Sequence, residues 1–163
     1  GQTDHSLLFW EAICANAQGE ETEATRCLRL AATGDRTINI HSYYNDQPVD
    51  YLFWQGMALR LLGEQHTAQQ LFSEMKQWAQ EMAKTSIEAD FFAVSQPDLL
   101  SLYGDLQQQH KEKCLMVAML ASAGLGEVAQ YESARAELTA INPAWPIAEL
   151  FTTVIPFIFN YVH

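Results

Sequence analysis

The dipeptide Gly-Glu occurs three times in the chain, and each copy lies between two stretches with helical periodicity. The copies begin at Gly19, Gly63 and Gly126. Glycine adopts the left-handed backbone conformation that closes many helices at no steric cost, so each glycine predicts the end of a helix. An amphipathic stretch resumes directly after each glutamate. The sequence therefore predicts three helical hairpins, each closed by the same short turn.

Around the first two turns the chain repeats with the offset of 44 residues that separates Gly19 from Gly63. Small residues recur at matched positions, which lets two antiparallel helices approach closely, and a bulky residue fills the space beside them. This pattern is typical of tetratricopeptide hairpins. The chain is therefore predicted to be all-α, a tetratricopeptide-like α-solenoid of about three hairpins. The matched pairs are Leu8 with Leu52, Ala12 with Gly56, Ala15 with Leu59, Ala24 with Ala68, Leu28 with Phe72, and Ala31 with Met75.

The third hairpin keeps its own offset, 63 residues from Gly63 to Gly126, only through its first helix. Met119, Ala121 and Leu125 then correspond to Gly56, Ala58 and Leu62. Beyond the turn, the apolar residues fit only if the turn is three residues longer than in the second hairpin. These apolar residues are Ala134, Leu138 and Ile141.

The predicted domain is single, as 163 residues favour. Its hairpins span 5–33, 49–84 and 106–141, with helices over 5–17, 21–33, 49–62, 65–84, 106–123 and 127–141. A terminal helix is expected over 146–160. The start at Gly1, with no initiating Met, suggests a piece of a longer protein.

An insertion over 85–104 separates the second and third hairpins. Ser95 with Asp98 has the spacing of a capping box, and Pro97 suits a first helical turn. Gly104 followed by Asp105 suits a helix stop and a new cap. We therefore predict one or two short helices in the insertion.

The charge balance narrows the classes of partner. The chain carries 20 acidic and 9 basic side chains, a net charge of −11. Such a field repels phosphate backbones and anionic lipids, so neither nucleic acid nor a membrane is expected as a partner. Cys14, Cys27 and Cys114 are odd in number and far apart, which favours buried free thiols, a reducing compartment and a cytoplasmic location.

Residues Asp90–Leu100, with the sequence DFFAVSQPDLL, resemble a known family. The chain is similar to the C-terminal tetratricopeptide-repeat region of large bacterial proteins that carry the domain of unknown function 5107 in their N-terminal half. Further matching stretches are Tyr51–Leu59 with Leu62-Gly63, and Gly104-Asp105-Leu106. Gln96 departs from the leucine that the family favours, and Gly104 from an acidic residue. The resemblance implies a β-rich N-terminal region and an association with carbohydrate metabolism, but no settled activity.

The insertion also holds the best candidates for a special site. Asp90, Ser95, Asp98 and Tyr103 could line a pocket beside two aromatic rings. The simpler interpretation is that Ser95 and Asp98 cap helices while the phenylalanines enter the core. Spacing ties no second carboxylate to these residues, so it supports no acid–base pair.

The chain shows no signature of a metal, a cofactor or a nucleophile. His110 and Cys114 stand four residues apart on a predicted helix and could face one ion. Two ligands alone do not define a site, so a buried cysteine beside a solvated histidine is the simpler interpretation. Cys14 has no base assigned to it by spacing.

Two aromatic groups are candidates for contact with a partner. Tyr51 starts the second hairpin and is expected to point away from its packing face. The terminal segment has an apolar stripe at 147, 150/151, 154/155 and 158, and Phe157, Phe159 and Tyr161 lie off that stripe. We therefore expect an interface there, with a second copy of the chain or with another part of a longer protein.

Two hypotheses about function follow. The first is a non-enzymatic module that binds a protein segment or docks an N-terminal domain of its own protein on a concave surface. The second is an accessory subdomain whose insertion completes the active site of a carbohydrate-related enzyme.

Overall fold

The computed structural model describes residues 4–38, 50–85, 97–143, 154, 155 and 158, with only the backbone for 97–106. Within these ranges the chain is all-α and contains no strand, as predicted. The helices in chain order are α1 (His5–Ala17), α2 (Glu21–Ala31), α3 (Tyr51–Leu61), α4 (Gln65–Met82), α5 (Pro97–Leu125) and α6 (Val128–Ile141).

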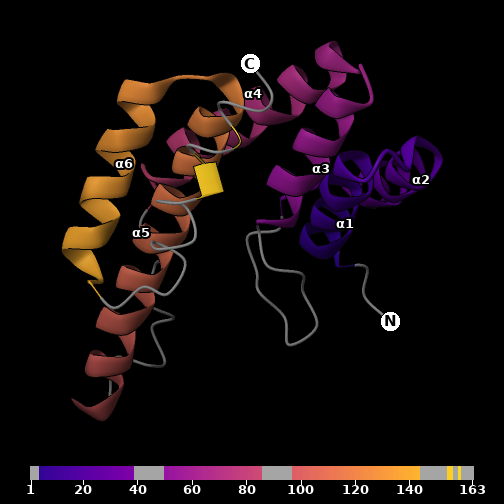
Figure 1. Ribbon diagram of the computed structural model, residues 1–163. Coiled ribbons are helices and arrows are strands. Elements are labelled where there is room, and N and C mark those ends of the chain that lie inside the picture. Colours follow the sequence, from indigo (N-terminus) through magenta and orange to yellow (C-terminus); the bar gives the residue numbers. More distant parts are fainter. Residues whose placement is uncertain (1–3, 39–49, 86–96, 144–153, 156–157, 159–163) are drawn as a thin grey trace.

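The helices pair as consecutive hairpins, α1 with α2, α3 with α4, and α5 with α6 (Figure 1). The middle hairpin lies between the other two: α3 contacts α1 and α2, and α4 packs along α5. Each described helix follows its predicted range closely at one or both ends. The structure therefore contains the predicted series of helical hairpins.

The three Gly-Glu turns share one geometry. The glycines are left-handed, with φ of 78° at Gly19, 85° at Gly63 and 77° at Gly126. The following glutamate N–H donates to a carbonyl five residues earlier, at 2.9 Å in each turn, which satisfies an orphan carbonyl of the ending helix. The carbonyl of the same glutamate then accepts the first hydrogen bond of the next helix. A two-residue turn therefore ends one helix and begins the next.

The third hairpin corrects a prediction about its register. Its turn has the same length as that of the second hairpin, because α6 begins at Val128, 63 residues after Gln65. The expectation of a turn three residues longer was wrong. Tyr131 and Leu138 are buried at the positions that Ala68 and Met75 occupy in α4. A large tyrosine in place of the small alanine hid the register in the sequence.

The insertion was also predicted incorrectly in its second half. Pro97 begins a helix as expected, but that helix is α5 itself, which runs without a break to Leu125. Gly104 and Asp105 lie in its interior and are neither a stop nor a cap. An interior glycine costs only about 1 kcal/mol relative to alanine, and packing of the rest of α5 against α4 and α6 outweighs that cost. The first part of α5 projects beyond its neighbours (Figure 1).

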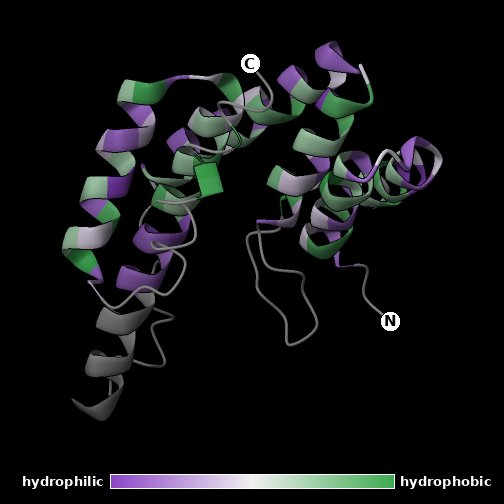
Figure 2. Cartoon of the chain, viewed as in Figure 1, coloured by the Kyte–Doolittle hydropathy of each residue, from purple (hydrophilic) through white to green (hydrophobic). Residues whose placement is uncertain are grey.

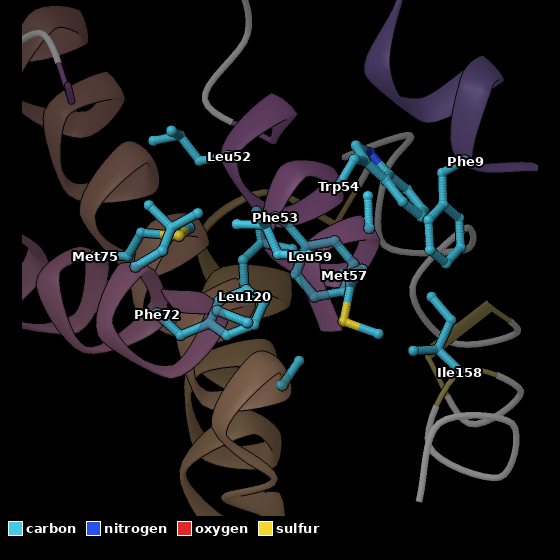
Figure 3. Close-up of a cluster of buried hydrophobic side chains, with 14 of the residues drawn as sticks. Phe9, Leu52, Phe53, Trp54, Met57, Leu59, Phe72, Met75, Leu120 and Ile158 are labelled. Carbon is cyan, nitrogen blue, oxygen red and sulfur yellow. The ribbon is translucent and has the colours of Figure 1, made fainter. Parts of the chain in front are cut away.

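The core centres on α3, in which every residue from Leu52 to Leu59 is buried. Aromatic rings form a chain from α1 to α4: Phe9 lies 5.3 Å from Trp54, Trp54 lies 5.2 Å from Phe53, and Phe53 lies 6.1 Å from Phe72, between centroids (Figure 3). Buried apolar residues of the other helices belong to the same cluster, and hydrophobic and hydrophilic residues alternate along the described helices (Figure 2).

Phe72 joins α3, α4 and α5 at a point where all three helices approach closely. The tip of its ring meets Gly56 of α3, and one side of the ring meets Gly124 of α5. A Cβ built on either glycine would come closer than 3.0 Å to ring atoms. Arg60 covers the ring with its guanidinium 5.5 Å from the ring centroid, and its Nη2 donates to the Gly124 carbonyl at 2.5 Å. The two glycines thus provide the space that the ring fills.

We expect Gly56→Ala to destabilise the fold by about 1–3 kcal/mol through overpacking, despite the helix preference of alanine. The ring cannot move aside, because Gly124 bounds it on another side. Urea unfolding followed by circular dichroism measures the effect. In a Phe72→Leu background the same change should be neutral or stabilising. An equal loss in both backgrounds would contradict the wedged ring.

Candidate functional site

The largest groove that we describe, the α4–α5–α6 groove, has a volume of about 610 Å³. A stripe of α5 forms its floor, and the C-terminal ends of α4 and α6 form its walls. Of the described lining residues, the small and apolar ones are mostly buried or half-buried, whereas most of the polar ones are exposed. The lining residues are Ala79, Gln80, Ala83, Thr85, Gln107, Gln108, His110, Lys111, Cys114, Leu115, Ala118, Glu137 and Ile141.

His110 fixes the end of α4 at one side of this groove. Its Nε2 lies 2.9 Å from the carbonyl oxygen of Met82, the last residue of α4. The same carbonyl accepts hydrogen bonds from the Thr85 N–H at 3.0 Å and the Thr85 hydroxyl at 2.8 Å. Three donors thus satisfy a carbonyl that a helix end would otherwise leave unpaired. In this position His110 orders the wall of the groove.

The neighbouring Cys114 is not activated by this histidine. Its Sγ lies 3.7 Å from Nε2 of His110, close enough to suggest a nucleophile with its base. A carbonyl can only accept, so the Nε2 atom that faces Met82 must carry a proton. The same nitrogen therefore cannot take the proton of the thiol. Burial also raises the pKa of Cys114, which keeps the thiol protonated.

The charged residues of the groove are paired with each other. Lys111 of α5 and Glu137 of α6 form an ion pair of 2.9 Å across the opening, with each side chain more than half exposed. Such a pair contributes little to stability, and water screens it. In the part of the chain that the structure describes, no three His, Cys, Asp or Glu side chains gather in a way that could hold a metal ion.

Tyr51, a predicted partner residue, packs against the first hairpin. Its ring centroid lies 5.5 Å from that of His5, and its hydroxyl donates to the Thr37 carbonyl at 3.3 Å. His5 Nδ1 in turn donates to the Ala31 carbonyl at 2.8 Å, and the buried Gln55 donates to the Thr33 carbonyl at 2.6 Å. These side chains hold the end of α2 and the segment after it, a role that the sequence did not reveal.

The side chains of the other predicted site residues lie outside what the structure describes. Asp90 and Ser95 lie outside the described residues, as do Phe157, Phe159 and Tyr161. Asp98 and Tyr103 belong to the first part of α5, of which only the backbone is described.

Part of the terminal stripe does pack on the core. Ile155 and Ile158 are buried, and Val154 is partly buried against the same cluster. All three belong to the apolar stripe predicted from the sequence. The stripe therefore packs within the chain at these positions.

A second groove, the α1–α2–α3 groove, has a volume of about 340 Å³ and lies where the first hairpin meets the end of α3. It is lined by Ala12, Ile13, Asn16, Glu21, Ala24, Thr25, Leu28 and Leu61. Neither groove was predicted. The available signal for the larger one was the apolar spacing of Cys114, Leu115 and Ala118 on α5, with Ala79 and Ala83 on α4.

No protein-family model matches the chain, and no solved structure matches it. The similarity to the tetratricopeptide region of proteins with the domain of unknown function 5107 therefore stays a prediction. Among the helices of the described ranges, none is both long enough and apolar enough to cross a bilayer.

The three thiols should differ in reactivity. Cys14 is exposed, whereas Cys27 and Cys114 are buried, and burial raises the pKa of both buried thiols. Since the thiolate is the reactive form, a disulfide reagent at pH 8 should modify Cys14 first, and the others only slowly until the pH rises well above 8. Single-cysteine variants assayed by absorbance measure each rate, with denatured protein as the control. A Cys114 that reacts as fast as Cys14 would show that His110 does activate it.

Proposed function

We propose that this chain is a non-enzymatic protein-interaction module, built from tetratricopeptide-like hairpins, that holds an apolar protein segment in the α4–α5–α6 groove. The observation that carries the proposal is the groove itself. Its floor combines the half-buried Leu115 and Ala118 with the buried Cys114, and the small Ala79 and Ala83 form one wall. Binding is favourable when an apolar side chain of a partner replaces water on the apolar surface of an open groove.

The spacing of the floor residues suggests how a segment would lie. Gln107, Lys111, Cys114 and Ala118 follow one another at intervals of four, three and four residues, so they form one line along α5, with Leu115 beside it. A helical segment laid parallel to this line would place its own residues at matching intervals. The groove volume of about 610 Å³ lies in the range of binding sites for ligands of several side chains.

The chemistry of the groove favours binding over catalysis. His110 is committed to the end of α4, the Cys114 thiol stays protonated, and Lys111 pairs with Glu137. The described lining residues of the groove include no activated nucleophile and no pair of free carboxylates. The partner would contact the groove through apolar side chains. The proposed location is the cytoplasm, because the described thiols are free.

The test uses twelve-residue peptides selected from a displayed random library against the whole chain. Selected peptides should lose at least about tenfold in affinity with Ala83→Trp, which narrows the groove, and with Leu115→Lys, which places a charge on its floor. Ala140→Trp is the matched control, because Ala140 is exposed on α6 outside the groove. Fluorescence anisotropy measures binding, and circular dichroism confirms that each variant is folded. Peptides that bind all variants equally, or a selection that enriches none, would refute the proposal.

A further inference from the structure

The first and second hairpins meet at a first junction, and the second and third hairpins meet at a second. Because the hairpins repeat at fixed offsets, the two junctions can be compared residue by residue. In the second junction, Phe72 of α4 fills the space between Gly56 and Gly124, and Arg60 covers its ring. With the offset of 44 residues, Leu28 stands at the position of Phe72 and Asn16 at that of Arg60. Both replacements are smaller, and Asn16 carries no charge.

The first junction is correspondingly incomplete. Ala12, Ala24 and Leu28 line the α1–α2–α3 groove at the positions of Gly56, Ala68 and Phe72. Leu61 of α3 borders the groove at the position that Gly124 of α5 takes in the second junction, one offset of 63 residues later. The groove of about 340 Å³ therefore lies where the second junction holds a phenyl ring and a guanidinium.

The mouth of this groove carries negative charge. Glu21 lines it in place of the neutral Gln65 of the second hairpin, and Glu20 precedes it. Glu23 is neutralised by Arg26, whereas within the described ranges no cation pairs with Glu20 or Glu21. Both carboxylates are exposed and available to a cation from outside.

We propose that the α1–α2–α3 groove binds an aromatic side chain followed by a basic one on a protein partner, so that the partner supplies the ring and the cation that the chain itself supplies at the second junction. The ring would lie against the half-buried Ile13, Thr25 and Leu61, above the buried Ala12, Ala24 and Leu28, and the cation would face Glu21. This site is separate from the α4–α5–α6 groove, and neither proposal depends on the other.

Blocked dipeptides test the recognition on the whole chain. N-acetyl-Phe-Arg-amide should shift the methyl resonances of Ala12, Ala24 and Leu28 in NMR spectra, with a dissociation constant on the order of 1 mM, as for a small ligand that buries one ring. N-acetyl-Ala-Arg-amide lacks the ring and N-acetyl-Phe-Glu-amide reverses the charge, so both should bind more weakly. Absence of any shift, or equal affinity for the Phe-Arg and Phe-Glu probes, would overturn the proposal.

Variants locate the contacts. Glu21→Gln should weaken the Phe-Arg probe about two- to fivefold, the range of an exposed ion pair, while Glu20→Gln removes the same charge beside the groove and should have a smaller effect. The double variant Ala12→Gly with Leu28→Phe copies the Gly56–Phe72 pair and should fill the groove and abolish binding. Circular dichroism shows whether that variant is folded. Unchanged binding by the folded double variant, or an equal effect of the two glutamate changes, would also overturn the proposal.

Discussion

The ring of Phe72 is the contact on which the arrangement of the second and third hairpins depends. It reaches from α4 to Gly56 of α3 and Gly124 of α5, so three helices meet around one side chain. Arg60 then covers the ring and bonds the end of α5 through the Gly124 carbonyl. This arrangement has a cost in desolvation free energy at Arg60, because its Nε and Nη1 atoms are buried with no partner in the described part of the chain. Burial also lowers the pKa of this guanidinium. The junction therefore combines close packing with a charge kept partly out of water.

The elements of the fold could be predicted from the sequence because each turn is determined by a few adjacent residues. A glycine followed by glutamate specifies a helix end whatever the packing, and all three such turns form as expected. Gly104 shows the limit of that reasoning, since a glycine ends a helix only where tertiary packing does not continue it. The register of α6 was missed for a similar reason: Tyr131 replaces a small residue, and the spacing of small residues was the guide.

The candidate site was harder to predict, because grooves depend on how helices from different hairpins lie together. Ala79 and Ala83 form the wall of a groove only because α6 also lines it, with Glu137 and Ile141. His110 and Cys114 were recognised as neighbours from their spacing. The proton that Nε2 must carry could be assigned only once the Met82 carbonyl was located. Spacing along one helix thus predicts proximity, while the chemistry depends on a third group from another helix.

The complete burial of α3 affects how the domain gains and loses structure. Each hairpin is closed by a two-residue turn, and its two helices are neighbours along the chain, so the contacts within a hairpin can form early. The stretch from Leu52 to Leu59 is different, since its faces are covered by helices that precede and follow it in the chain. Loss of either outer hairpin exposes part of this stretch to water. We therefore expect the described helices to fold and unfold as one cooperative unit, in contrast to long repeat arrays, in which structure can melt progressively from an end.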